Sequence, residues 1–194
     1  MSKQILPYPQ GIWRTILRLP LLMHQYGLGG LIRPFPYLVL TTKGRRTGME
    51  RHTVLEYRRH GSKYYVISGW GKSPHWYQNL VVNPDVTLQL GSKEIAARAQ
   101  VVENTSEALR ALYMFQRTSP LYEIIMASMS SADTLDLRTL TDVSDEFTIV
   151  RFDVQAGNPA LTGVRPKNQW LGPIILAGIL MTLVWMVITR LSDE

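Results

Sequence analysis

Apolar and polar positions alternate through the middle of the chain in short runs that end at glycine-containing turns. Alternation with a period of two, rich in Val, Thr and aromatic residues, is the pattern of half-buried antiparallel strands. In the run 51–59, for example, Arg51, Thr53 and Leu55 fall on one face, whereas His52 and Val54 fall on the other. Strands are predicted at 36–42, 51–59, 63–70, 86–90, 94–102 and 147–154.

A helix is predicted between the third and fourth of these strands, in the segment "SPHWYQNLVVNP". Ser73 is its expected N-cap with Pro74 at the first helical position, and Asn83 precedes a proline that ends the helix. Trp76 and Leu80 are four residues apart, so they should face the sheet.

Two other segments are helical in pattern. The N-terminal stretch reads as a short amphipathic helix broken by Pro20, and a longer helix is expected over about 106–129. Several antiparallel strands with few helices predict a mainly β (α+β) fold, a small β-barrel with flanking helices. The predicted organisation is a helix and turn at 1–30, the barrel domain at 31–154, a linker at 155–170, a transmembrane helix at 171–189 and a tail at 190–194.

The transmembrane prediction rests on 19 residues, 171–189, that carry no charge. At about 1.5 Å per residue this run would span roughly 28 Å, close to the thickness of a bilayer core. A helix that is apolar on every side is typical of a membrane span rather than of a helix on a soluble core. Trp170 stands where an interfacial aromatic would stand, so a single C-terminal membrane anchor is expected.

The charges beside this run indicate an orientation. Arg165 and Lys167 precede it, whereas Arg190 follows it together with Asp193 and Glu194. The positive-inside rule then places the N-terminal domain in the cytoplasm.

Composition excludes several kinds of site. The chain has no cysteine, so disulfides, thiolate nucleophiles and iron–sulfur clusters are absent. Its four histidines have no metal-ligand spacing, and neither a phosphate-binding glycine loop nor a nucleophile motif is present, so no metal site is expected. If the protein is an enzyme, a cofactor therefore carries the chemistry.

Charge is concentrated in one segment. The net charge is +6, and the stretch "LTTKGRRTGMERHTVLEYRRH" (40–60) holds six Lys and Arg against two Glu. Such clustering on a strand–turn–strand pattern indicates a site for an anionic partner. Arg58 and Arg59, at the end of the second strand, are predicted to be a solvated strand end.

Two stretches resemble the deazaflavin-dependent nitroreductase family. They are "LTTKGRRTGMERHTVLEY" (40–57) and "YYVISGWGKSPHWYQNLVVNPDVTLQLG" (64–91), and the resemblance extends over about 15–102. Family members have a T-T-x-G-R-[KR]-[ST]-G turn and a later W-Y-x-N-L-x-x-N-P-x-V motif. The "SGWG" before the helix resembles the subgroup described as nitroreductases or quinone reductases.

This resemblance implies a split β-barrel related to flavin-mononucleotide-binding proteins, and the deazaflavin coenzyme F420 as cofactor. The tail of F420 carries a phosphate and a poly-glutamate chain, which arginines bind through bidentate hydrogen bonds. The family's cofactor-binding positions lie on the basic turn, the second strand, a facing wall and the start of the motif helix. They match Arg45, Arg46, Thr47, Gly48, Arg51, Thr53, Val54, Leu55, Ile67, Ser68, Gly69, Trp70, His75, Trp76, Tyr77, Gln78 and Asn79.

The implied activity is hydride transfer from reduced deazaflavin to a lipophilic acceptor, such as a quinone, an activated double bond or a nitro compound. The membrane anchor favours a substrate that is concentrated in the bilayer. No catalytic residue follows from the match, and Tyr113 and Tyr122 are only loosely placed candidates for a proton donor.

Other readings of the sequence are open. The same fold could hold flavin mononucleotide as a flavin reductase, although a single phosphate needs fewer cations than a poly-glutamate tail. A non-catalytic, membrane-tethered module that binds cofactor or lipid is a further alternative. Nucleic-acid binding is disfavoured, because no aromatic platform is interleaved with the basic turn.

Overall fold

The computed structural model of the chain describes residues 19–28, 36–118, 147–165, 167, 170–174, 177–178 and 181–182. The strands are β1 (Tyr37–Lys43), β2 (Glu50–Glu56), β3 (Arg58–His60), β4 (Lys63–Ser68), β5 (Asp85–Leu90), β6 (Lys93–Val101) and β7 (Thr148–Val154). The helices are α2 (Leu19–Gln25), α3 (His75–Val82) and α4 (Thr105–Thr118).

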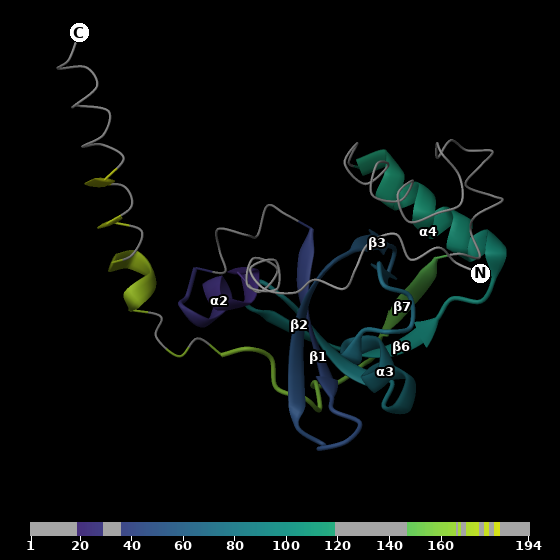
Figure 1. Cartoon of the computed structure of the whole chain (residues 1–194), viewed down its shortest axis with the longest axis horizontal. Coiled ribbons are helices and arrows are strands. Elements are labelled where there is room, and N and C mark those ends of the chain that lie inside the picture. The colour runs from purple at the N-terminus through teal and green to yellow at the C-terminus, as the bar shows by residue number, and fades with distance from the viewer. Residues whose placement is uncertain are drawn as a thin grey trace, which may run out of the picture.

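The strands form one antiparallel sheet in the order β2-β1-β5-β6-β7-β4-β3 (Figure 1). The strand predicted at 51–59 is two strands, because the chain changes partner at Tyr57. Its backbone N–H donates to the Pro36 carbonyl at 2.8 Å, and the chain then leaves β1 to pair with β4. The two edge strands of the sheet are therefore consecutive in sequence, which requires the sheet to curl on itself. The predicted mainly β fold, a curled sheet with helices on its flank, is confirmed.

The curled sheet encloses the main core on its inner face. Side chains that alternate along five strands meet there, among them Leu38, Leu40, Val66, Leu88 and Phe152, all exposed by 1% or less. The inner face of β6 contributes to this core, since Ala97 and Ala99 are buried in the cluster and Ile95 and Val101 pack against it. The alternation along these strands therefore separates a core face from an outer face.

Helix α4 covers the opposite, outer face of β4 and β7. Its buried residues Ala111, Leu112 and Phe115 pack with Tyr65 and Ile149 in a second apolar cluster. Figure 1 shows α4 and β3 at one end of the sheet, and α3 with the β1–β2 turn at the other. The molecule therefore has two distinct ends, each with its own polar side chains.

Helix α3 begins one residue later than its sequence predicts. Pro74 is the N-cap, with ψ at 142°, and no side chain caps the helix. Ser73 instead lies in the preceding turn, where its carbonyl accepts a hydrogen bond from Gln78 Nε2 at 2.9 Å. The helix ends at Asn83 as predicted, and Trp76 and Leu80 are buried against the core.

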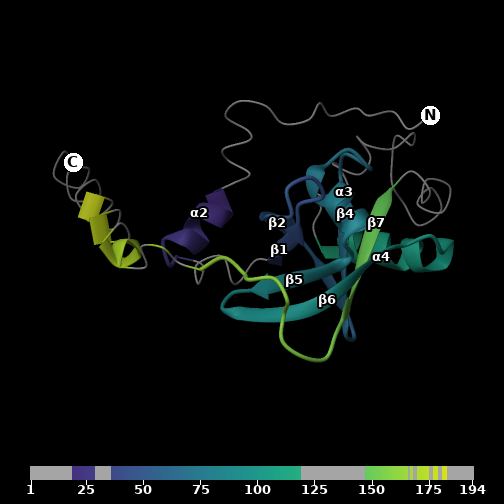
Figure 2. The same cartoon turned by 90° about the horizontal axis from the view of Figure 1, so that it is seen from below.

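The stretch after β7, predicted as a linker, is hydrogen-bonded to the outer face of the sheet over residues 161–164. Gln89 exchanges two hydrogen bonds with the Val164 backbone, at 2.8 and 3.1 Å, and Thr87 Oγ1 donates to the Leu161 carbonyl at 2.7 Å. Figure 2 shows this segment running from β7 past β5 and β6 toward α2. We call residues 161–164 the strap.

The chain ends lie largely outside the described residues. Helix α2 carries Pro20 in its first turn, and the amphipathic segment predicted before it is outside the described part. Among the described residues, no helix is long and apolar enough to cross a membrane. Most of the predicted span 171–189 belongs to the part that the structure does not describe.

Candidate functional site

The basic turn between β1 and β2, residues 44–49, is closed by its own backbone. The Gly44 N–H donates to the Met49 carbonyl and the Gly48 N–H donates to the Gly44 carbonyl, both at 2.8 Å. Gly48 has φ +68°, a left-handed conformation that favours glycine. A Cβ on Gly44 would lie 3.0 Å from the Met49 carbonyl oxygen, so there is little room for a side chain. The glycines at the two ends of the turn thus fix its shape.

Asn79 of α3 holds the basic turn in place. Its Oδ1 accepts hydrogen bonds from both the backbone N–H and Nη1 of Arg45, each at 3.2 Å. Its Nδ2 donates to Thr42 Oγ1 at 3.3 Å, and the Thr42 hydroxyl donates to the Arg51 carbonyl at 3.4 Å. Asn79 is 4% exposed and Thr42 fully buried, so this network is dry and costly to disrupt.

The network brings together three predicted site residues, Arg45, Arg51 and Asn79, that are far apart in sequence. The sequence identified Asn79 as a motif residue but not as the support of Arg45. A signal was present, because Asn79 stands between Trp76 and Leu80 on the apolar face of the helix. A buried amide on such a face must have partners.

We count Arg51, the second residue of β2, with the basic turn, whose remaining cations are available for a ligand. Arg46 and Arg51 are exposed, and neither forms an ion pair with any residue that the structure describes. The acidic residue of the turn region, Glu50, is engaged elsewhere, because its carboxylate accepts the Thr162 N–H of the strap at 2.8 Å. The turn therefore presents uncompensated positive charge.

His52 adds no charge to this segment at neutral pH. Its Nδ1 lies 3.0 Å from Thr41 Oγ1 on the outer face of the sheet. Burial lowers the pKa of His52 below 6.5, although Glu50 opposes this effect. The positive charge of the segment accordingly comes from its lysine and arginines.

The residues predicted to line the cofactor ring are divided between two faces. On β2, Leu55 packs against the core and Thr53 pairs with Leu40, whereas Val54 pairs with Val39 of the outer face. On β4, Ile67 packs on the outer face with the α4 cluster, so it is not brought together with the inner-face residues.

The segment after β4 turns sharply. Ser68 Oγ donates to the Gly71 carbonyl at 2.5 Å, and Gly69 and Trp70 are half-buried in the turn. At the start of α3, His75 is exposed and Gln78 half-buried. Thr47 and Gly48 lie exposed in the basic turn.

Trp76 and Tyr77 are core residues of α3. They are 8% and 6% exposed, and their rings pack edge to face with centroids 6.1 Å apart. Burial raises the pKa of Tyr77, which keeps its hydroxyl protonated. These aromatics position the helix, and hence Asn79, against the sheet.

The two tyrosines named as loose catalytic candidates are not brought to the turn. Tyr113 is 41% exposed on α4, at the end of the sheet away from the basic turn. Tyr122 lies outside the described residues. In the described part of the chain, no three His, Asp or Glu side chains are grouped as they would be around a metal ion.

Arg58 was predicted to be solvated, and this prediction is wrong. Its side chain is 8% exposed, and it donates to Thr118 Oγ1 at 2.6 Å, the Tyr57 carbonyl at 2.9 Å and Glu56 Oε1 at 2.8 Å. The guanidinium also lies 4.6 Å from the centre of the Phe115 ring. Helix α4 covers it, and the period-two pattern cannot show that a helix from later in the chain packs there. Arg59 is exposed, as predicted.

Comparison with known proteins gives a consistent result. The family model for F420H(2)-dependent quinone reductases matches residues 21–132, more than half of the chain. The F420H(2)-dependent quinone reductase of Mycobacterium tuberculosis H37Rv is 39% identical over 71 residues, which are 35% of this chain and 48% of that protein. The chain thus spans about half the length of the first relatives it matches.

A second protein of the same strain, which carries this enzyme name provisionally, is 32% identical over 82 residues, 41% of this chain and 69% of its own. A solved F420-H2-dependent reductase aligns with 61% of this chain and 94% of its own at a TM-score of 0.46 and 22% identity. From the extent of the family match, the chain belongs to the F420H(2)-dependent quinone reductase family.

Proposed function

We propose that this protein is an oxidoreductase that uses reduced coenzyme F420 to reduce a quinone-type acceptor. Family membership and the names of the relatives support the activity and the cofactor. The observation that carries the proposal is the basic turn, whose Arg45 is oriented by Asn79 and whose Arg46 and Arg51 make no ion pair among the described residues.

The residues of the turn fit the anionic part of F420. A phosphate with a poly-glutamate chain presents several negative charges, and planar guanidinium groups on a rigid turn bind such oxygens well. Arg45, Arg46 and Arg51 would hold this tail, with the Thr47 hydroxyl as a further donor. When bound, the reduced deazaflavin supplies a hydride.

The protein's own contribution is positioning. Asn79 fixes Arg45 before any ligand arrives, which lowers the entropic cost of binding. The buried aromatics of α3 and the two glycines of the turn keep this geometry rigid.

We further propose that the acceptor is lipophilic and that a C-terminal membrane anchor delivers the domain to it. The support is the uncharged run 171–189 and the residue that precedes it, Trp170, which is 63% exposed. Menaquinone is a suitable test acceptor. A cytoplasmic orientation of the domain follows from the charges that flank the run.

A binding titration tests the cofactor. Fluorescence of F420 and of flavin mononucleotide should be followed in parallel on the full chain in neutral detergent. We expect tight binding of F420 and weak binding of flavin mononucleotide. Tighter binding of flavin mononucleotide would replace the proposal with a flavin reductase, and binding of neither would leave a non-catalytic module.

A truncation tests the acceptor. Ending the chain after Pro166 retains the strap, which is hydrogen-bonded to the sheet, and so should leave F420 binding unchanged. Oxidation of reduced F420 should be measured with menaquinone in vesicles and with a short-tailed, water-soluble quinone. The truncation should slow only the menaquinone reaction, and equal rates on menaquinone with and without the anchor would contradict a membrane-delivered acceptor.

A further inference from the structure

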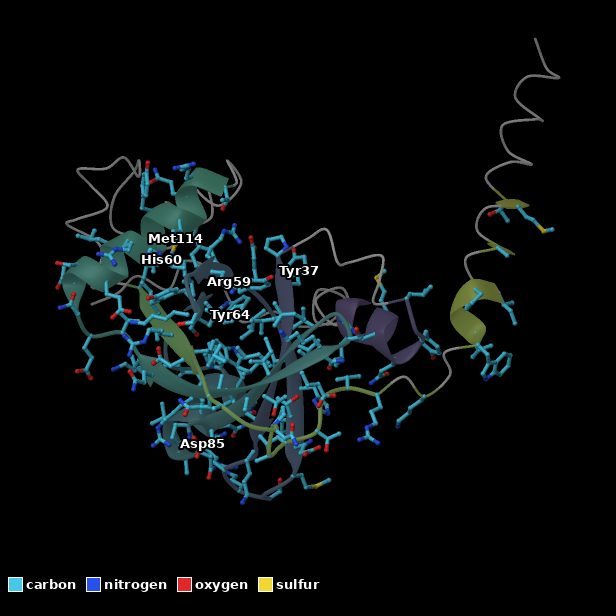
Figure 3. All side chains as sticks on the ribbon, turned by 180° about the vertical axis from the view of Figure 1, so that it is seen from behind. Tyr37, Arg59, His60, Tyr64, Asp85 and Met114 are labelled. Carbon is cyan, nitrogen blue, oxygen red and sulfur yellow. The ribbon has the colours of Figure 1, made fainter. Side chains whose placement is uncertain are left out.

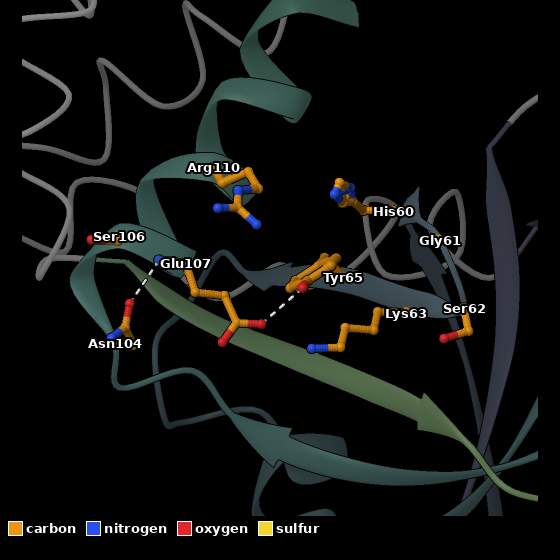
Figure 4. A pocket seen from close by; sticks show the side chains of 9 residues that line it. All are labelled: His60, Gly61, Ser62, Lys63, Tyr65, Asn104, Ser106, Glu107 and Arg110. Atoms are coloured by element: carbon orange, nitrogen blue, oxygen red, sulfur yellow. Dashed lines mark hydrogen bonds between the residues drawn. The ribbon is translucent and has the colours of Figure 1, made fainter.

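A pocket lies at the end of the sheet opposite to the basic turn. Its volume is about 450 Å³, and it opens between the β3–β4 hairpin and the first turns of α4 (Figure 4). It is lined by His60, Gly61, Ser62, Lys63, Tyr65, Asn104, Ser106, Glu107 and Arg110.

This pocket is separate from the proposed cofactor site. Strand β2 begins at the basic turn and leads away from it, and at about 3.3 Å per residue it alone spans roughly 20 Å. His60 follows at the far end of β3. Figure 3 shows His60 beside α4, at the opposite end of the domain from Asp85, which follows α3.

The floor of the pocket is a fixed polar network. The Tyr65 hydroxyl donates to Glu107 Oε1 at 2.8 Å, and Arg151 Nη1 donates to both oxygens of Glu107 at 2.9 Å. Arg151 Nε also donates to Asp153 Oδ2 at 2.9 Å. Tyr65 is 4% exposed, so the floor is rigid and partly dry.

The two carboxylates near the pocket already form ion pairs with a protein side chain. Glu107 and Asp153 both pair with Arg151, and Asp153 is the cross-strand partner of Lys63. Burial and the hydrogen bond to Glu107 raise the pKa of Tyr65 to about 12, so its hydroxyl stays a donor. The pocket therefore offers donors and cations rather than free acceptors.

Two cations of the pocket wall, Lys63 and Arg110, are not held by a close carboxylate of any described residue, although the charge of Lys63 acts on Glu107 and helps to lower its pKa. Neither Lys63 nor Arg110 forms an ion pair within the described part of the chain, and Figure 4 shows both side chains directed into the pocket on either side of Tyr65. With Arg151 they outweigh the two carboxylates by one positive charge, before any contribution from His60. The hydroxyls of Ser62 and Ser106 add neutral donors.

The start of α4 is not what makes the pocket basic. Asn104 Oδ1 accepts the Glu107 N–H at 3.0 Å, so the helix is capped by its own side chain. The positive potential instead comes from side chains of two separate elements that converge on one space.

We propose that this pocket is a second anion site, for a phosphate group, distinct from the proposed cofactor site. Arg110 and Lys63 would bind the phosphate oxygens, with Ser62, Ser106 and His60 around them. The group could belong to a small soluble phosphate or to the headgroup of an anionic lipid. The proposal does not depend on the proposed function.

The test is a titration of the full chain in neutral detergent micelles with inorganic phosphate, followed by backbone amide NMR shifts. The amides of Ser62, Lys63 and Ser106 should shift with one common affinity. Arg110→Gln should weaken that affinity about tenfold, as expected when a charged hydrogen bond is lost. The same substitution should leave phosphate-induced shifts at the basic turn, 44–49, unchanged.

Arg98→Gln is the matched control, since it also removes one arginine, but one that is exposed and paired with Asp85 at 2.9 Å. It should leave both sets of shifts unchanged. The proposal is overturned if the pocket amides do not shift, or if Arg98→Gln weakens their response as much as Arg110→Gln does.

Vesicles distinguish the two sources of the phosphate group. If vesicles with anionic phospholipid displace phosphate from the pocket, and neutral vesicles do not, the ligand is a lipid headgroup. If neither displaces it, the site takes a soluble phosphate. A failure of F420 binding would not alter either result.

Discussion

Arg58 and the arginines of the basic turn belong to one short basic stretch of the sequence, 40–60, yet the fold uses them in opposite ways. Arg58 is buried under α4, where three hydrogen-bonding partners and the Phe115 ring surround its guanidinium. Arg46 and Arg51 are exposed and have no ion pair among the described residues. Arg45 stands between these cases, since a neutral amide orients it without neutralising its charge.

The difference shows what separates a structural cation from one that is kept for a ligand. A buried guanidinium needs its charge compensated by a carboxylate, and Glu56 does this for Arg58. A ligand-binding guanidinium needs orientation but no carboxylate, and the oxygen of Asn79 provides that for Arg45. The basic cluster in the sequence therefore contains two groups: the structural Arg58, and the arginines of the basic turn that can bind a ligand.

Charge reversal in the turn should have the largest effect. Arg46→Glu combined with Arg51→Glu removes two attractive charges and adds two repulsive ones, so F420 affinity should fall by more than about a hundredfold. Both side chains are exposed, so the free energy of unfolding should change by less than about 0.5 kcal/mol. Fluorescence titration in moderate salt and urea unfolding measure the two quantities, and an unchanged affinity would contradict the account.

Arg58→Met should have the reverse profile. It leaves Glu56 and Thr118 without their buried partner, which should lower the free energy of unfolding by about 2 to 3 kcal/mol. The F420 affinity of the folded protein should be unchanged. Arg59→Met is the control, because Arg59 is exposed and its single hydrogen bond, to the Gly61 carbonyl at 2.8 Å, should be worth little. Equal costs for the two variants in urea unfolding would show that Arg58 is not a structural residue.

Asn79→Asp tests the intermediate case. The new carboxylate can still accept from Arg45, but it neutralises the guanidinium and loses the donor to Thr42. F420 affinity should fall about tenfold, whereas stability should change by only about 1 kcal/mol. Asn79→Ser is neutral and shorter, so it should cost more stability than Asn79→Asp. For each kcal/mol of stability lost, it should lower the F420 affinity less than Asn79→Asp does. If the loss of F420 affinity is proportional to the loss in free energy of unfolding for both variants, the only role of Asn79 is to support the fold.

The smallest effect concerns the ion pair at the other end of the sheet. Burial by itself would raise the pKa of Glu107, but hydrogen bonds from Arg151 and Tyr65 lower this pKa below 4.5. A carboxyl with a lowered pKa stabilises the fold above its ordinary pKa, and this contribution is lost as the pH falls through the folded value.

Glu107→Gln should therefore cost about 1 kcal/mol at neutral pH and flatten the decline in stability below pH 4.5. Urea unfolding as a function of pH measures this. Asp85→Asn removes an exposed ion pair, so the decline in stability at acid pH should stay as it is in the original protein. If Glu107→Gln leaves the decline in stability at acid pH unchanged, the lowered pKa of Glu107 is not one of its causes.

Much of the fold follows from local patterns, because they depend on neighbours along the chain. The strand segments and the end of α3 at Asn83 were predicted from alternation and from proline. The break at Tyr57 was not, since it arises where the strand leaves β1 for β4, and partner choice is not a local property. The burial of Arg58 depends likewise on α4, which comes about fifty residues later.

The candidate site shows the same limit. The motif named Arg45, Arg51 and Asn79, but only the structure joins them: Arg45 donates twice to the Asn79 amide oxygen, and Thr42 links the Asn79 amide nitrogen to the Arg51 carbonyl. The strap was predicted as part of a linker because the longer stretch 155–168 is polar and contains proline and glycine. Its attachment through Gln89 and its hold on Glu50 depend on residues that lie far apart in sequence.

The central claim is that the cations of the basic turn, which form no ion pair with any described residue, bind the anionic tail of F420. The most direct test measures the affinity of the original protein and of Arg46→Gln/Arg51→Gln for two ligands, F420 and the same deazaflavin without its poly-glutamate chain. We expect the double substitution to weaken F420 binding by at least about tenfold and to change binding of the tail-less ligand by much less. An equal loss for both ligands would mean that these arginines do not recognise the tail, and the account would be wrong.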